Sequence, residues 1–306
     1  MLKNGEFAYN KSYSVGYDFG SIKRLDRYSM GALSMLYICF SLKKHNSDFM
    51  KAYFDSLKWY REIYMISAEG ARNHGLLNVP TDDFFDTKHY LPQNEDEQRK
   101  IADFLIALEH RIEAQQSLVD NLKKYKRGFV KLVFEQAARK AQQQLPLSEM
   151  CISISSGRTT VSDTNGSFPL FGSTGVVGKT NTVEFDGDIV LVARVGANAG
   201  RVNYFSGQCA VTDNTLVVRV KGNIIQAKFL AYFLEYYDLH RLIFGSGQPL
   251  VTGGQLKKIE MPLVSLTTQD RITKRFETLD NIIKAQETYA LNLSRLKTGL
   301  MQQLFI

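Results

Sequence analysis

Residues 97–134 read EQRKIADFLIALEHRIEAQQSLVDNLKKYKRGFVKLVF, and residues 268–305 read TQDRITKRFETLDNIIKAQETYALNLSRLKTGLMQQLF. Identical residues recur 171 positions apart in the two stretches, so one unit has been used twice along the chain. The shared residues are Gln98, Ile101, Leu108, Ile112, Ala114, Gln115, Leu122, Gly128 and Phe134 in the first stretch, and Gln269, Ile272, Leu279, Ile283, Ala285, Gln286, Leu293, Gly299 and Phe305 in the second.

Each stretch predicts one long helix with a heptad seam. Apolar residues step by four and three positions from Ile101 to Phe129, and again from Ile272 to Leu300. We expect the two helices to pair as an antiparallel coiled coil. At 1.5 Å per residue, each helix is a rod of roughly 55 Å that could hold two domains apart. The expected pairing residues are Leu108, Ile112, Gln115, Leu279, Ile283 and Gln286.

Two glutamines, Gln115 and Gln286, interrupt the seams at equivalent positions. In an antiparallel pair their amides should meet. A buried amide pair penalises shifted registers, because one amide would then face leucine or isoleucine without a partner. The alternative is that each helix packs separately onto its own domain and leaves its glutamine in solvent.

The composition indicates a globular protein of about two domains. The sequence has no run of about 18 apolar residues, and its start lacks the charged and apolar segments of a signal peptide. We therefore expect a cytoplasmic protein with no membrane partner. The net charge of +7 is compatible with a nucleic-acid partner. Cys39, Cys151 and Cys209 lack zinc-site spacing, so we expect no metal and interpret them as small buried residues.

The chain alternates between domains of mixed α/β (α+β) structure and long helices. The expected segments are a first domain at 1–92, a helix and polar linker at 93–144, a second domain at 145–262 and a second helix at 263–306. Within the domains we expect β structure at 33–42, 168–171, 188–193 and 215–220, and helices at 47–60 and 227–237.

One stretch resembles a nucleotide site. Residues 172–180 read GSTGVVGKT, but Ser173 stands where the first glycine of a phosphate loop belongs. The next residues predict a strand, not a helix that would present its amino terminus to a phosphate. A P-loop nucleotide-binding protein is kept only as an alternative. Other signatures of catalysis are absent and the five histidines are scattered, so we expect no catalytic residues.

Several motifs resemble the DNA specificity subunit of type I restriction-modification systems. In the second half they are FPLFGSTGVVG at 168–178, GDIVLVARVGANAG at 187–200, AVTDNTLVV at 210–218, GSGQPLVT at 245–252 and Met261-Pro262 before the second helix. The first half is similar through GARNHGLLNV at 70–79, Leu91-Pro92 and EQRKIADFL at 97–105, so the resemblance covers almost the whole chain.

The resemblance implies a non-catalytic subunit with two target-recognition domains, each of which reads one half of a split site in double-stranded DNA. It also implies docking of two methyltransferase subunits and of restriction (translocase) subunits. S-adenosylmethionine, ATP and Mg²⁺ would act on those partners, and no cofactor would bind this chain.

The family motifs place candidate DNA-binding residues in glycine-rich loops. Arginine, asparagine and glutamine offer paired donors, or a donor and an acceptor, to base edges. Each could instead hold its own loop together through backbone hydrogen bonds. In the second domain these candidates are Arg194, Asn198, Arg201 and Gln248, with Lys179 near them. In the first domain polar and basic residues gather at 21–27 and in the loop at 70–78, and the candidates there are Lys23, Arg24, Arg72 and Asn73.

The sequence departs from the family pattern at its start. Gly5-Glu6 corresponds to Gly187-Asp188, so about 40 residues that precede Gly187 have no counterpart before residue 5. We expect a partial first recognition domain, which another chain could complete or which could be unable to read its half-site. A silent truncated or rearranged allele is therefore a further alternative.

Overall fold

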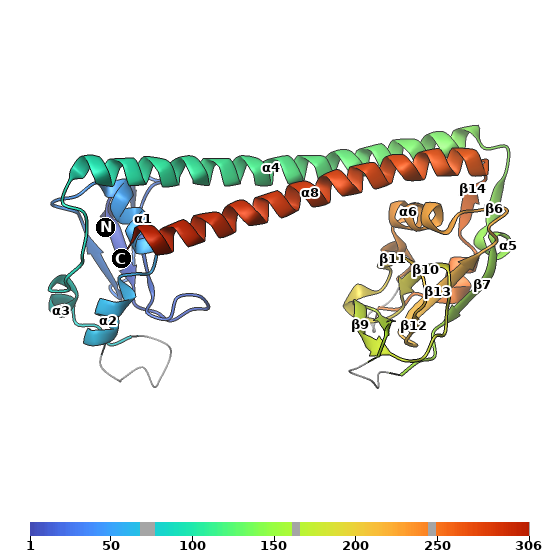
Figure 1. Cartoon of the computed structure of the whole chain (residues 1–306), viewed down its shortest axis with the longest axis horizontal. Coiled ribbons are helices and arrows are strands. Elements are labelled where there is room, and N and C mark those ends of the chain that lie inside the picture. The colour runs from blue at the N-terminus through green and yellow to red at the C-terminus, as the bar shows by residue number, and fades with distance from the viewer. Residues whose placement is uncertain (68–76, 161–165, 244–248, 306) are drawn as a thin grey trace. The chain divides into compact units, whose positions relative to one another are not determined.

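The computed structural model describes residues 1–67, 77–160, 166–243 and 249–305. The chain divides into two compact units, which we call unit 1 (Met1–Val119 with Ala285–Ile306) and unit 2 (Asp120–Lys284). Each unit contains a mixed α/β domain and part of both long helices (Figure 1). The expected mixed fold with two long helices is confirmed.

The long helices extend beyond the repeated sequence. Helix α4 spans Glu95–Lys140 and helix α8 spans Leu266–Leu304. The polar tract at 139–144 was expected to be the linker, but its first two residues, Arg139 and Lys140, are helical. Strand β6 (Gln144–Pro146) follows closely and pairs with β14 (Glu260–Pro262), so the polar stretch between the first helix and the second domain is short.

Within each unit the two helices run antiparallel. In unit 1, Glu109 forms an ion pair with Lys297 at 3.0 Å, and Gln115 donates to the Gln286 side chain at 2.7 Å. In unit 2, Lys126 pairs with Asp280 at 2.5 Å. Residue numbers rise along α4 as they fall along α8, which defines the antiparallel pairing. The predicted seam residues are all buried or half-buried, and none is exposed.

Unit 1 is built on a small antiparallel sheet with the order β3-β2-β5. These strands span Ser21–Arg24, Phe7–Asn10 and Tyr37–Phe40, and a separate pair joins β1 (Leu2–Lys3) to β4 (Met30–Gly31). Helices α1 (Ser47–Asp55), α2 (Tyr60–Ile66) and α3 (Thr81–Phe85) complete the domain. The core is aromatic, and in it Phe305, which directly follows α8, packs against Phe49 of α1 with 5.4 Å between the ring centroids.

The single helix expected at residues 47–60 was wrong, because α1 ends at Asp55 and α2 begins at Tyr60. Leu57 has a positive φ of 61°, which a helix interior does not allow. The Trp59 indole donates to the carbonyl of Phe54 at 2.7 Å and fixes this turn in the core.

Among its described residues, unit 2 contains two sheets of three or more strands in addition to the pair β6–β14. The larger has the order β11-β10-β13-β7, and its strands span Val202–Ser206, Asp188–Ala193, Thr215–Val220 and Cys151–Ser156, all antiparallel. The smaller has the order β12-β8-β9, with strands at Ala210–Val211, Phe168–Gly172 and Gly175–Thr180. The helices are α5 (Leu147–Met150), α6 (Ala227–Tyr237) and α7 (Gly253–Lys257).

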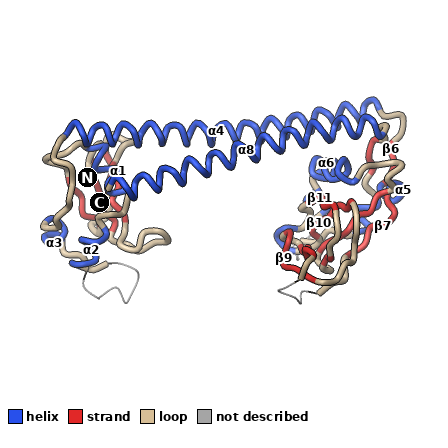
Figure 2. Tube along the Cα trace, in the orientation of Figure 1, coloured by secondary structure: helices blue, strands red, loops and turns tan. Residues whose placement is uncertain are grey.

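Side-chain alternation along β10 explains the layers of unit 2. Val190 and Val192 join the core with α6, whereas Ile189 and Leu191 pack in a second cluster with Phe171 of β8. Helix α6 therefore lies between the larger sheet and α8 (Figure 2).

A buried glutamine fastens the start of each long helix to its own domain. Gln98 accepts from the backbone N–H of Asn46 at 2.8 Å and donates to the carbonyl of Pro92 at 2.6 Å. Gln269 accepts from the N–H of Gln226 at 2.9 Å and donates to the carbonyl of Val264 at 2.9 Å. Asn46 and Gln226 are the N-cap residues of α1 and α6, so the repeated glutamine connects each long helix to the start of its domain helix.

The three cysteines are free thiols in different environments. Burial raises the pKa of Cys151 and of Cys209 to about 11 in each case. Cys39 is exposed, so its expected burial was wrong. Side chains alternate along β5, and Ile38 rather than Cys39 faces the core.

Two further findings concern the residues that the structure describes. No helix among them is long and apolar enough to span a bilayer. They also contain no group of three or more histidine, cysteine, aspartate or glutamate residues arranged to hold a metal ion.

Candidate nucleic-acid interface

Several strands of unit 2 end together at one end of the larger sheet. Ala193, the last residue of β10, lies opposite Thr215, the first residue of β13. Ser156, the last residue of β7, lies opposite Leu216. Antiparallel pairing therefore gathers the loops that follow β7 and β10 and precede β11 and β13. We call these the sheet-end loops, and they carry Arg158, Arg194 to Arg201, Asp213 and Asn214.

The backbone of Arg194 is held on both sides. Its N–H donates to the carbonyl of Asn214 at 2.9 Å, and its carbonyl accepts from the N–H of Val251 at 2.8 Å. Its guanidinium makes one long contact, 3.5 Å from Nη1 to the carbonyl of Asp213. The half-exposed side chain therefore keeps donors for a ligand on a fixed backbone.

Arg201 and Asn198 stand at the other end of the same loop. Asn198 closes the 3-10 turn η1 (Gly196–Asn198), and its carbonyl accepts from the N–H of Arg201 at 2.9 Å. The exposed Arg201 donates to the carbonyl of Thr174, in the β8–β9 turn, at 3.4 Å. Gly200 between them has a φ of 87°, and an added Cβ would lie 3.2 Å from the Cβ of Leu239. Glycine is required there.

Lys179 is not brought to these arginines. It is exposed on β9, opposite Pro169, whereas the β8–β9 turn beside Arg201 is at Thr174. Because residues 175–180 form a strand, the loop and helix of a phosphate-binding site are not formed there. The P-loop alternative is dropped.

Three candidates, Gln248, Arg72 and Asn73, lie outside the described residues. The segment after residue 248 does reach the sheet-end loops. Val195 forms a bridge with Leu250, and the N–H of Gly196 donates to the carbonyl of Pro249 at 3.1 Å.

In unit 1 the structure gives Arg24 a structural role. Its guanidinium contacts Asp26 at 2.6 Å, Asp48 at 2.7 Å and the hydroxyl of Ser47 at 2.8 Å, and so fastens β3 to the first turn of α1. Lys23 pairs with Asp55 at 2.5 Å. Burial alone would lower the pKa of Lys23, but the hydrogen bond to Asp55, the negative charge of Asp55 and the neighbouring Tyr17 together outweigh burial, so the pKa lies above its ordinary value.

Lys11, which the sequence analysis missed, occupies in unit 1 the place that Arg194 occupies in unit 2. It follows β2 as Arg194 follows β10, and its carbonyl accepts from the N–H of Leu77 at 2.9 Å as that of Arg194 accepts from Val251. The following loop ends at Gly20, whose φ of 77° matches the positive φ of Gly200.

Arg158 was also missed. It is exposed two residues after the end of β7, and its N–H donates to Glu184 at 3.0 Å. A basic residue within two positions after the end of a strand is the signal that could have indicated both Lys11 and Arg158.

The sheet-end loops of unit 2 can bind anionic or hydrogen-bond-accepting ligands. Arg158, Arg194 and Arg201 present guanidinium groups, which bind phosphate oxygens or the O6 and N7 atoms of guanine through two parallel hydrogen bonds. Their backbone groups are hydrogen-bonded to neighbouring segments of unit 2, which reduces the entropy lost on binding.

The sequence of this domain is similar to those of known proteins. Residues 146–293 match the model of the family described as the type I restriction modification DNA specificity domain. The specificity subunit of the type I restriction enzyme EcoprrI from Escherichia coli is 27% identical over 138 residues, which are 44% of this chain and 34% of that protein. A putative type I specificity subunit from Mycoplasma pneumoniae is 30% identical over 112 residues, 35% of this chain and 37% of that protein. The chain thus matches about a third of the length of these relatives.

Solved structures share the fold over nearly the whole chain. The S subunit of a type I restriction-modification system from M. genitalium has a TM-score of 0.65 at 17% identity, and the similarity covers 100% of this chain and 84% of that one. The HsdS subunit from Thermoanaerobacter tengcongensis has a TM-score of 0.56 at 19% identity, covering 99% and 81%. The resemblance predicted from the sequence is confirmed, and residues 146–293 belong to the family of type I restriction-modification DNA specificity domains.

Proposed function

We propose that this chain is the DNA-reading specificity subunit of a type I restriction-modification complex and that it recognises a bipartite target in double-stranded DNA. The observation that carries the proposal is the set of arginines on the sheet-end loops of a domain whose family is named for DNA specificity. The loops at the corresponding end of the unit 1 sheet, with Lys11, are proposed to read the second half-site.

The chain itself is proposed to be non-catalytic and to act in the cytoplasm. Two methyltransferase subunits and the restriction subunits would assemble on it and supply S-adenosylmethionine, ATP and Mg²⁺ chemistry. One matching chain comes from a structure described as the structural basis of complex assembly and conformational transition of the type I R-M system. This match supports the assignment at the level of the fold.

Mapping of methylated bases across a genome tests the proposal. Cells would express the chain with its cognate methyltransferase subunit, and cells that lack the chain would serve as the reference. We expect a new split motif. Absence of new methylation, although the complex still assembles in a pull-down assay, would contradict the proposal and favour a silent allele.

Variants assign the two halves of the motif. Arg194→Ala should relax the bases of one half only, and Lys11→Ala should relax those of the other. Arg219→Ala is the matched control, because Arg219 is an exposed arginine of the same sheet, near the other end of β13. A motif with only one defined half would assign all base reading to unit 2.

A further inference from the structure

The helices α1 and α6 occupy the same place in their units. The N–H groups of their N-cap residues, Asn46 and Gln226, donate to the repeated glutamines Gln98 and Gln269. Asn46 and Gln226 lie 180 positions apart, so each residue of α1 is equivalent to the residue of α6 that comes 180 positions later. Phe49 is therefore equivalent to Phe229, and Tyr53 is equivalent to Phe233. All four of these aromatic residues are buried, as the correspondence requires.

In unit 2 this correspondence singles out Tyr232. Its ring packs edge-on against Phe276 at 5.0 Å, and its hydroxyl donates to Asp280 at 2.7 Å. The ammonium group of Lys126 lies 5.2 Å from the ring centre and also pairs with Asp280. The buried ring thus lies between α6 and the long helices, in contact with a partly exposed cation and carboxylate.

Unit 1 contains residues equivalent to the neighbours of Tyr232, but it has no tyrosine at the equivalent position. Ala52 stands at the position of Tyr232, and along the long helices Leu105, Glu109 and Lys297 correspond to Phe276, Asp280 and Lys126. Glu109 and Lys297 form the same ion pair, at 3.0 Å.

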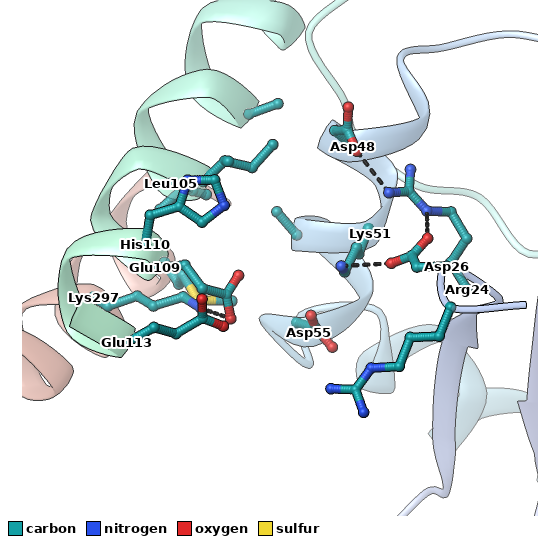
Figure 3. Close-up of a pocket in the computed structure, with 15 residues that line it drawn as sticks. Arg24, Asp26, Asp48, Lys51, Asp55, Leu105, Glu109, His110, Glu113 and Lys297 are labelled. Atoms are coloured by element: carbon teal, nitrogen blue, oxygen red, sulfur yellow. Dashed lines mark hydrogen bonds and ion pairs between the residues drawn. The ribbon is translucent and has the colours of Figure 1, made fainter. Parts of the chain in front are cut away.

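A cavity of about 550 Å³ occupies the place of the missing ring, and Ala52, Leu105, Glu109, Lys297 and Met301 contribute to its lining. Figure 3 shows the pair Glu109 and Lys297 on one side of it and Asp48, Lys51 and Asp55 of α1 on the other.

We propose that this cavity receives a tyrosine side chain of a partner polypeptide, with the phenol hydroxyl donating to Glu109 and the ring lying beneath Lys297. The same chain uses this chemistry for its own Tyr232 in unit 2. The cavity is open enough to admit residues next to the tyrosine, and its rim carries both signs of charge through Arg27, Lys51, Asp55 and Glu113. The charged rim can bind the polar backbone and side chains that flank a tyrosine in a polypeptide. A free phenol has no such groups.

The first test uses p-cresol, the side-chain analogue of tyrosine, and the full-length protein. Met301 lines the cavity, so its ¹³C-labelled ε-methyl resonance, assigned with Met301→Leu, reports occupancy. We expect saturable shifts with p-cresol and about tenfold weaker binding of toluene, because toluene cannot donate to Glu109. Glu109→Leu should abolish the preference for p-cresol.

Two alanine–tyrosine exchanges form a matched pair. Ala52→Tyr should fill the cavity, raise the Tm and remove p-cresol binding at Met301. Tyr232→Ala should lower the Tm and create a second site, so that p-cresol raises its Tm more than that of the wild type. If p-cresol rescues Tyr232→Ala but produces no saturable shift of Met301 in the wild type, the proposal is wrong. Equal binding to wild type and Ala52→Tyr would also overturn it.

The occupant is tested with N-acetyl-tyrosinamide, which adds peptide groups to the phenol. We expect it to bind at Met301 at least as tightly as p-cresol, and N-acetyl-phenylalaninamide to bind about tenfold more weakly. Exclusion of N-acetyl-tyrosinamide while p-cresol binds would assign the cavity to a free phenol and overturn the polypeptide as its occupant.

Discussion

At the scale of single residues, Arg194 and Arg201 are expected to contribute to DNA binding in different ways. The backbone of Arg194 is held by Asn214 and Val251. Replacement of Arg194 by alanine should therefore weaken the free energy of DNA binding by about 1–3 kcal/mol and remove discrimination at one base pair. Arg201 lies beside the β8–β9 turn, and a phosphate contact there would weaken binding to all sequences and reduce the salt slope by about one.

Fluorescence anisotropy over a range of salt concentrations separates the two roles. The assembled complex would be titrated with the mapped DNA site and with single-base variants of that site. Arg219→Ala should bind like the wild type. If Arg194→Ala lost affinity equally for every sequence, a base-reading role for Arg194 would be ruled out.

The thiols provide a second prediction at this scale. Burial and a pKa of about 11 leave Cys151 and Cys209 with almost no thiolate at pH 8, whereas Cys39 is exposed. A maleimide should therefore modify one thiol per folded chain and three in denaturant, as counted by mass spectrometry. Cys39→Ser should leave none reactive in the folded protein, and rapid modification of Cys209 would contradict the buried position of its side chain.

Sequence patterns predicted that Arg194 and Arg201 lie on loops, but they did not predict the contacts of Arg24 in β3. Arg194 and Arg201 lie beside glycines in a motif, and the structure places them on loops at a sheet end. Arg24 is equally basic in sequence, yet Asp26 and Asp48 engage its guanidinium. Asp26 lies only two residues after Arg24, but Asp48 comes from helix α1, which no local pattern connects to β3, so the sequence did not indicate that the guanidinium is engaged by both carboxylates.

At the scale of elements, the repeated glutamines at the helix starts are expected to be essential for stability. Gln98→Leu would leave the N–H of Asn46 and the carbonyl of Pro92 without their side-chain partner in a buried site. We expect a loss of about 3 kcal/mol in the free energy of unfolding, measured by denaturation in urea. Gln136→Leu is the control, since Gln136 is an exposed glutamine of the same helix. A loss below about 0.5 kcal/mol would show that water or another group satisfies these atoms.

The glutamines in the helix seam have a different expected effect. Gln115 donates to the side chain of Gln286 at 2.7 Å and to its carbonyl at 3.3 Å. Replacing both residues with leucine removes donor and acceptor together, so thermal stability should be kept or raised while the register relaxes. Cross-links between cysteines at positions 109 and 297, in a background with Cys39→Ser, report the native register.

A pair at positions 113 and 297 reports a register shifted by one turn. Mixed cross-linking in the double-leucine variant is the expected result. An unchanged pattern with only the 109–297 product would show that the two amides do not set the register.

Elements with strong periodicity could be predicted, and elements ended by tertiary contacts could not. The heptad seams, β10, β13 and α6 follow from apolar patterns that their local sequence carries. The break after Asp55 depends on Trp59 bonding to Phe54 in a core formed by distant residues. The burial of Gln98 likewise depends on Asn46, 52 residues earlier, so the sequence showed that this glutamine recurs without showing why.

At the scale of the whole molecule, both long helices pass from unit 1 into unit 2, with unit borders between Val119 and Asp120 in α4 and between Lys284 and Ala285 in α8. We propose that helix length sets the spacing of the half-sites. Inserting one heptad at both borders adds about 10 Å to each helix while keeping the seam nearly in phase. The number of undefined base pairs between the half-sites should then increase by about three, because base pairs rise 3.4 Å each, and the specified bases should not change.

Methylation mapping of cells that express the lengthened chain measures this spacing directly. A variant with one heptad inserted only in α4 is the matched control, because it places Gln115 out of register with Gln286 and should destabilise the chain instead of producing a new spacing. An unchanged spacing in the double insertion, with methylation retained, would mean that the helices do not measure the DNA target.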